Sequence, residues 1–230
     1  VKSLTFQISP LTRPTNNWLM RYGYLDESIN SQMLDLSLPL ADIRRGMRKG
    51  HNYDVDRSPK LLRCRVSNTT DSPKTPQRYQ HLHTVDAGRV TRPQTTFDLQ
   101  EKWVKDGTGI IVEATHEGLT VGFAYINVYK MGAYYMSACS DPSIKGMPIG
   151  HAIIWKVIEY LKDHGITDFE LGWQQYGSQI HDFPSEKEIE ISRFKRGFGG
   201  YTLPLFRGTV YYTKTAFTSV MEERTKRMTS

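Results

Sequence analysis

Two carboxylates lie close together in an apolar segment near residue 170. In the run ITDFELGW, Asp168 and Glu170 alternate with Phe169 and Leu171. Alternate side chains of a strand point to opposite faces, so the two carboxylates share one face. A carboxylate on a buried strand acts either as a general base with a raised pKa or as the ion-pair partner of an arginine. Both interpretations of Glu170 stay open.

A histidine stands at the start of a predicted helix. Apolar residues at helical spacing predict a helix over residues 148–164, and His151 lies in its first turn. Histidine changes its charge near neutral pH, so His151 is a candidate for orienting a substrate or relaying a proton. Simple packing is the alternative.

The loop before this helix has the composition of an anion-binding site. Residues 141–150 lead from a predicted strand into the helix and include Lys145, Gly146 and Gly150. The N–H groups and the dipole of a helix N-terminus attract phosphate, and Pro148 suits the first helical turn. We expect the loop to hold phosphate groups of a substrate; an ordinary Gly/Pro loop is the alternative.

Tyrosine and arginine side chains provide further candidates. Tyr134 and Tyr135 alternate along a predicted strand, so one belongs to the core and the other can line a cleft and protonate a leaving group. The pattern does not decide between them, and Tyr135 is our candidate. Arg89 and Arg92 flank a turn, where a guanidinium suits phosphate or carboxylate, although exposed loop arginines are common.

Two weaker patterns predict no site. His81 and His83 have the spacing of metal ligands on a strand, but no carboxylate or cysteine stands at a suitable interval, so we predict no metal. The basic residues between Arg44 and Lys49 are typical of a solvated helix face, with nucleotide or tRNA phosphates as the alternative partner.

These candidates need a framework of strands and helices to position them. In the first part of the chain the patterns predict a strand at residues 32–38, a basic helix from Pro39 to Gly50, a strand at 60–66 and a loop at 67–76. After it we predict helices at 77–85 and 97–105, an antiparallel three-strand meander at 109–114, 119–130 and 133–140, the helix at 148–164 and a parallel strand at 166–173. A capping box at Ser185 and Glu188 starts a helix to Lys195, and a strand at 208–214 precedes a frayed tail.

The composition is that of a globular protein. Of 230 residues, 38% are hydrophobic and 23% charged, which is enough for a core and excludes a disordered chain. The net charge of +6 fits an anionic partner such as a nucleotide, a phosphate or RNA. The two cysteines form no paired motif, and no apolar run is long enough for a membrane span or a leader, so we expect a soluble cytoplasmic protein.

Several sequence words resemble one protein family. The runs LHTVDAGRVTRP, AYYMSACSDP, PIGHAIIW, FELGW and RFKRGFGG are similar to the FemAB-like branch of the GCN5-related N-acetyltransferase (GNAT) superfamily. The resemblance implies an α+β or α/β fold, with a mixed, mainly antiparallel sheet flanked by helices. It also implies a truncated first GNAT-like subdomain at residues 1–70, a GNAT-like acyltransferase domain at 71–220 and a tail at 221–230.

The same resemblance implies an activity and its residues. Family members move an acyl or aminoacyl group from a thioester or a charged tRNA to an amine. In the family's Phe-Lys-x-x-Phe-Gly motif, Lys195 would lie near the transferred carbonyl and stabilise its oxyanion, with Arg193 beside it for substrate. The alternative is that both basic residues favour the helix C-terminus through its dipole. The loop at 141–150 departs from the family's Gln/Arg and Gly-x-Gly/Ala pattern.

Three functions follow as hypotheses. The first is transfer from acyl-CoA, as donor substrate and without a metal, to a small-molecule amine such as a sugar-nucleotide or another precursor of the bacterial cell envelope. The second uses aminoacyl-tRNA in a transfer of the peptidoglycan-bridge type. The third is a non-catalytic GNAT-like binding module. None of them predicts DNA as a partner.

Overall fold

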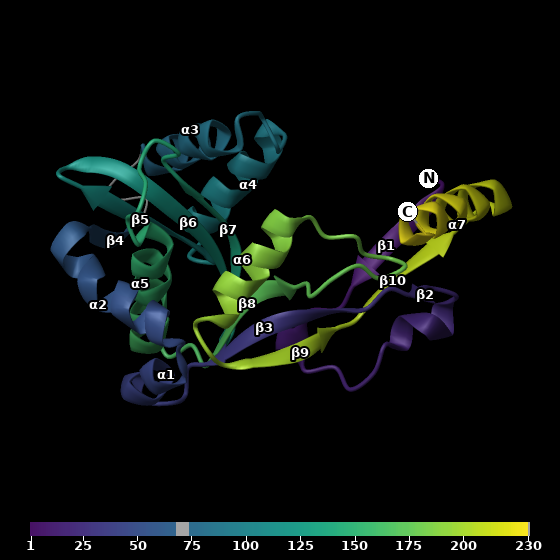
Figure 1. Cartoon of the computed structure of the whole chain (residues 1–230), viewed down its shortest axis with the longest axis horizontal. Coiled ribbons are helices and arrows are strands. Elements are labelled where there is room, and N and C mark those ends of the chain that lie inside the picture. The colour runs from purple at the N-terminus through teal and green to yellow at the C-terminus, as the bar shows by residue number, and fades with distance from the viewer. Residues whose placement is uncertain (68–73, 230) are drawn as a thin grey trace. The chain divides into compact units, whose positions relative to one another are not determined.

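The computed structural model describes residues 1–67 and 74–229 (Figure 1). Residues 68–73, most of the predicted loop at 67–76, lie outside the described part. Contacts group the chain into two units, Leu34–Leu171 and Val1–Met33 with Gly172–Ser230, and each unit is described separately. The predicted division at residue 70, between a truncated first GNAT-like subdomain and the acyltransferase domain, stays a prediction.

The first unit is built on a mixed sheet. Its strands follow the order β4-β5-β6-β7-β8, and every neighbouring pair is antiparallel except β7 with β8. The bounds are β4 Arg63–Ser67, β5 Gly109–His116, β6 Leu119–Tyr129, β7 Gly132–Ser140 and β8 Asp168–Gln174, of which residues up to Leu171 belong to this unit. The predicted meander and the parallel strand after the long helix are confirmed.

Helices cover both faces of this sheet. On one face, α3 (Thr75–Ala87) and α4 (Gln94–Lys105) bury Tyr79 and Phe97 against Phe123 and Tyr125 of β6 (Figure 1). On the other face lies α5 (Ile149–Asp163), whose Ile149 and Ile153 approach Gly122, and α2 (Lys49–Leu61) packs against α5. The alternation of β6 side chains between the two faces explains why both helix layers find an apolar surface.

The pairing between β7 and β8 is short. It extends from Gly132↔Asp168 to Tyr134↔Glu170, whereas β7 continues to Ser140. Just after this paired segment, the register between β6 and β7 shifts at Tyr125 and Ile126, which marks a bulge in β7. The second half of β7 therefore runs on beyond the paired segment toward the loop that opens α5.

The second unit contains two smaller strand assemblies. β1 (Ser3–Gln7), β10 (Arg207–Tyr211) and β2 (Leu25–Asp26) form an antiparallel sheet in the order β1-β10-β2, and β3 (Ile29–Asp35) pairs antiparallel with β9 (Tyr201–Leu205). Short 3-10 helices occupy Pro10–Thr12 and Trp18–Tyr22. Helix α6 (Glu186–Arg196) begins with the predicted capping box, because the Ser185 hydroxyl accepts from the Glu188 N–H while Glu188 accepts from the Ser185 N–H.

The first helical region differs from its prediction. The helix expected from Pro39 to Gly50 is α1 (Leu40–Gly46), and a second helix, α2, fills the segment up to Leu61, so that β4 starts at Arg63 rather than Lys60. Gly50, where the predicted helix ends, lies in the first turn of α2, and Pro59 also lies within α2. Burial of His51 and Val55 outweighs these weak local preferences.

Two other expectations are wrong, and one strand was not expected. His81 and His83 lie on helix α3, in agreement with the helix predicted at 77–85 and not with the strand assumed for a metal site. The expected frayed tail is α7 (Lys214–Thr229), which an ion pair at 2.6 Å from Arg224 to the buried Glu27 ties down. Strand β9 was not predicted from the sequence. Most of its residues are exposed and it contains Pro204, so it lacks the regular apolar and polar alternation that indicates a strand.

Candidate functional site

A polar cluster lies on the α3–α4 face of β7. Arg92 Nη1 donates to Ser137 Oγ at 3.1 Å, and Ser137 shares a second, short hydrogen bond with the Tyr79 hydroxyl. Burial raises the pKa of Tyr79, while the bond to Ser137 and the Arg92 charge oppose the rise. The turn between α3 and α4 thus brings one predicted arginine, Arg92, onto β7, whereas Arg89 in the same turn is exposed.

Next to this cluster, Tyr134 and Glu170 face each other across the last residue pair of β7 and β8. Glu170 is 3% exposed. Burial raises the pKa of Tyr134, the Glu170 charge adds to the rise, and Arg92 opposes it. A phenol with a raised pKa stays protonated at neutral pH and can donate a proton. Arg92, Tyr134 and Glu170 therefore meet where the strand pairing ends.

Tyr135 follows Tyr134 in β7. It pairs with Ile126 of β6, next to the register shift between Tyr125 and Ile126. Burial raises its pKa, with smaller contributions from Cys139 and Tyr79. The alternative that the sequence left open, Tyr134, is thus the tyrosine beside Arg92 and Glu170, and a catalytic role for Tyr135 stays a prediction.

The predicted phosphate loop joins β7 to α5. Asp141 Oδ1 accepts from the N–H and the hydroxyl of Ser143, which forms a tight turn and lowers the Asp141 pKa. Lys145 and Gly146 are exposed, and Gly146 has a positive φ of 73°. Arg57 Nη2 of α2 donates to the Gly146 carbonyl oxygen at 3.0 Å. The loop is therefore shaped by backbone turns and anchored by an arginine.

The first turn of α5 offers backbone donors. The Ala152 N–H donates to the Pro148 carbonyl oxygen at 2.9 Å, so the N–H groups of Ile149 and Gly150 come before the first N–H that donates within the helix. Such a turn, together with the exposed Lys145, fits the phosphates of an anionic substrate.

His151 packs between α5 and α2. Its Nε2 lies 3.6 Å from Asp54 Oδ2, and its ring centroid lies 4.5 Å from that of His51. Burial lowers the pKa of His151 to about 4; the charges of His51 and Arg57 add to the decrease, while Asp54 opposes it. His151 is therefore neutral at pH 7, and its proposed part in orienting substrate or moving a proton stays a prediction.

Lys195 and Arg193 belong to the other unit, at the C-terminal end of α6. Lys195 is half-buried and Arg193 is exposed, and the Arg193 carbonyl oxygen accepts from the Gly197 N–H at 3.2 Å. Next to them, Arg196 Nη1 donates to Gln174 Oε1 at 2.7 Å. Their placement relative to Glu170 and Tyr134 stays a prediction.

Sequence reasoning missed Ser137 and Tyr79. Ser137 joins Arg92 to Tyr79, but a serine within AYYMSACS gives no local signal. Only the packing of α3 against β7 reveals the contact. Within the described ranges, no three His, Cys, Asp or Glu side chains gather in a way that could hold a metal ion.

The sequence also matches a known family. Residues 41–184 match the family model described as "Acetyltransferase (GNAT) domain". This match spans more than half of the 230 residues, so the chain belongs to the acetyltransferase (GNAT) domain family. No curated protein matches the chain.

Solved structures agree with the fold. FemX is 11% identical, with a TM-score of 0.67 over 88% of this chain and 69% of that one. The C-terminal domain of a putative lysylphosphatidylglycerol synthetase from Agrobacterium fabrum is 13% identical, with a TM-score of 0.65 over 96% and 72% of the two chains. L-PGS from Bacillus licheniformis is 15% identical, with a TM-score of 0.61 over 88% and 66%. These likenesses confirm the predicted GNAT-type fold.

Among the residues that the structure describes, no helix is both long and apolar enough to cross a bilayer.

Proposed function

We propose that this protein is an N-acyltransferase that moves an acyl group from a thioester donor such as acyl-CoA to an amino group on a small molecule. A sugar-nucleotide or another precursor of the bacterial cell envelope is the proposed acceptor. The observation that carries the proposal is the three-residue pairing of β7 with β8, which ends at Tyr134 and Glu170. Beyond this point β7 has backbone groups outside the paired segment, and these suit an amide-containing donor arm.

The donor phosphates are proposed to bind at the start of α5. The residues there fit such a group: Ile149 and Gly150 offer backbone N–H donors, and Lys145 and Gly146 lie in the exposed loop just before them. The loop lacks the Gln/Arg and Gly-x-Gly/Ala pattern, so backbone donors carry more of the binding here. Arg57 fixes the loop through its bond to Gly146.

The buried carboxylate and the neighbouring phenol suit the two proton transfers. The acceptor nitrogen attacks the thioester carbonyl carbon and forms the C–N bond, and its proton passes to Glu170. The C–S bond then breaks, and the thiolate takes a proton from Tyr134. The Tyr134 phenol is protonated at neutral pH and so has a proton to give, while burial and the Glu170 charge, by raising its pKa, make it a weaker acid.

The remaining candidates bind or stabilise. Lys195 is proposed to stabilise the oxyanion, and Arg89, Arg92 and Arg193 to bind anionic parts of the substrates. The contact of Arg92 with Ser137, on the strand that also carries Tyr134, supports its part in this set. His151 and Tyr135 are kept as secondary candidates for proton relay.

Aminoacyl-tRNA is the second candidate donor. It is favoured by the likeness in fold to FemX and to the lysylphosphatidylglycerol synthetase domain, and by the net charge of +6, which suits a polyanion. Glu170 and Tyr134 would keep their roles with this donor: the carboxylate accepts the proton of the attacking amine, and the phenol protonates the tRNA hydroxyl that leaves the ester.

One assay separates these functions. The purified chain is incubated with acyl-CoA donors or with charged tRNA, together with amines and amino-sugar nucleotides, and the products are weighed by mass spectrometry. We expect an amide product and free CoA thiol in equal amounts. If product forms only with charged tRNA, the donor is an aminoacyl ester and not a thioester. A folded chain that transfers from neither donor would show a non-catalytic module.

Glu170→Gln tests the role of the carboxylate. Loss of a general base lowers turnover by about 10²–10⁴-fold, while the isosteric amide preserves the packing of β8. Glu101→Gln, which changes a partly exposed carboxylate of α4 that pairs with Lys105, is the matched control and should keep wild-type turnover. Equal turnover of Glu170→Gln and the control would contradict the role of Glu170 as base.

A further inference from the structure

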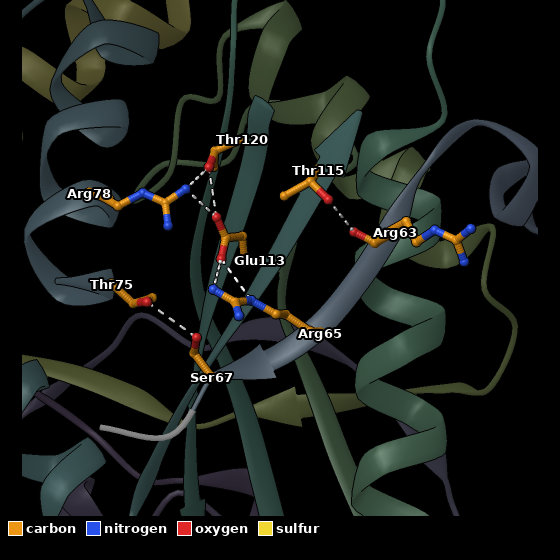
Figure 2. A network of polar contacts seen from close by, with 8 residues as sticks. All are labelled: Arg63, Arg65, Ser67, Thr75, Arg78, Glu113, Thr115 and Thr120. Atoms are coloured by element: carbon orange, nitrogen blue, oxygen red, sulfur yellow. Dashed lines mark hydrogen bonds and ion pairs between the residues drawn. The ribbon is translucent and has the colours of Figure 1, made fainter. Parts of the chain in front are cut away.

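A buried carboxylate in the first unit holds two arginines. Glu113 of β5 is 1% exposed and accepts from Arg65 Nε at 3.1 Å and from Arg65 Nη2 at 3.0 Å (Figure 2). It also accepts from Arg78 Nη2 of α3 and, at 2.6 Å, from the Thr120 hydroxyl. Arg78 in turn donates to Thr120. None of these residues belongs to the proposed transfer site.

This network leaves one edge of Arg78 available. A guanidinium has five N–H donors in a fixed plane, and every hydrogen bond of the Arg78 side chain within the described part of the chain leaves through Nη2. Figure 2 shows the opposite nitrogen of Arg78 pointing away from Glu113. Because Glu113 and Thr120 fix the plane, the free edge is oriented before any ligand arrives.

Arg78 also lines a cavity of about 740 Å³ between α3 and the start of β6. Its polar end contains Arg78, Thr120 and Lys74, and its apolar wall is made by Leu82, Val85 and Phe123. Around the cavity, the three basic groups Arg65, Arg78 and Lys74 outnumber two carboxylates, Glu113 and Asp141, so the balance is positive. The cavity therefore combines a fixed cation with an apolar wall.

We propose that this cavity is a second binding site, separate from the transfer site, for a small molecule with a phosphate or carboxylate group attached to an apolar or aromatic body. Arg78 binds the anion through its free edge, Lys74 adds positive charge, and the body packs on Leu82 and Val85. A cavity of this volume and lining is in the range of small-molecule sites. An arginine held only for structural pairing would not need to line a cavity.

Binding of phenyl phosphate to the full chain tests the proposal, with inorganic phosphate for comparison, by isothermal titration calorimetry. We expect phenyl phosphate to bind at least tenfold more tightly than phosphate. Arg78→Gln should weaken phenyl phosphate at least tenfold, and Lys60→Ala, an exposed charge on α2, should leave it unchanged. If Arg78→Gln lowers the melting temperature, Val85→Asp, which changes only an exposed cavity residue, must weaken phenyl phosphate instead.

Three results would overturn the proposal. The first is no binding of phenyl phosphate to the wild-type chain. The second is equal binding by wild type, Arg78→Gln and Val85→Asp. The third is displacement of phenyl phosphate by acetyl-CoA, since Asp141 also lines the cavity and belongs to the loop that leads to α5; competition would make the cavity part of the donor site. Transfer activity plays no part in this test, so its failure leaves the acyltransferase proposal untouched.

Discussion

At the scale of single residues, burial decides what His151 can do. Its ring lies between Asp54 and His51, and its pKa is lowered to about 4 from an ordinary value near 6.5. A neutral imidazole cannot hold a phosphate by charge at pH 7, but it can accept a hydrogen bond. The same burial makes His151 a source of pH-dependent stability.

Protonation of His151 should destabilise the fold in acid. Its folded-state pKa lies below its unfolded-state pKa, so between about pH 6.5 and pH 4 the unfolded chain binds more protons and the free energy of unfolding falls as the pH falls. We expect His151→Gln to reduce this loss by about 1–3 kcal/mol between pH 7 and pH 4. Urea unfolding at several pH values measures it. His164→Gln, an exposed histidine, is the control, and an identical slope in wild type and His151→Gln would contradict the account.

Lys195 tests whether a cation acts on the transition state. A positive charge directed at the oxyanion gains strength only as that charge develops, so Lys195→Ala should lower kcat about 10²–10³-fold with little change in KM. The melting temperature should change little, because a basic residue near a helix end contributes about 0.3–1 kcal/mol. Lys187→Ala, at the exposed start of the same helix, is the control. Unchanged kcat with a lower melting temperature would show a helix-end role alone.

At the scale of elements, the close approach of α5 to the sheet depends on one glycine. A Cβ on Gly122 would lie 2.5 Å from Ile149 Cγ2, in the first turn of α5, and 3.2 Å from the Cys139 carbonyl oxygen. Both neighbours flank the proposed donor site. Gly122 thus couples the packing of β6 to the position of the α5 N-terminus.

Gly122→Ala should therefore displace the start of α5. Overpacking of this kind costs about 1–3 kcal/mol of stability, and we expect weaker binding of acetyl-CoA as well. Gly46→Ala is the control, since nothing lies within 4 Å of a Cβ at that position. Thermal unfolding and acetyl-CoA titration of both variants measure the two effects. A Gly122→Ala protein as stable as Gly46→Ala would show that α5 can shift without cost.

Elements with strong periodic patterns were predictable, and contacts between elements were not. Alternation predicts the meander and the parallel strand β8, and helical spacing predicts α5. The capping box at Ser185 predicts the start of α6. Helix α2 was missed because Gly50 and Pro59 are ordinary breakers, whereas buried packing against α5 holds the helix. The bond from Arg92 to Ser137 and the bond from Arg78 to Glu113 depend on how α3 and the turn after it meet the sheet, which no local pattern encodes.

At the scale of the whole molecule, the chain combines the GNAT fold of its family with the loop at residues 141–150 that we propose for the donor phosphates. It belongs to the acetyltransferase (GNAT) domain family, and it spans 69% of FemX, the neighbour with a TM-score of 0.67. Its charge of +6 suits an anionic donor. The central claim is that this donor binds along the second half of β7 and at the N-terminus of α5.

Amide hydrogen exchange with and without acetyl-CoA tests this claim most directly. Bound donor would pair with backbone groups of β7 after Tyr134 and with the first turn of α5, and exchange there should slow. We predict protection in peptides that cover residues 135–140 and 149–152, none in α7, and no effect of adenosine at the same concentration. Unchanged exchange at both segments in the presence of saturating acetyl-CoA, or protection confined to other elements, would contradict it.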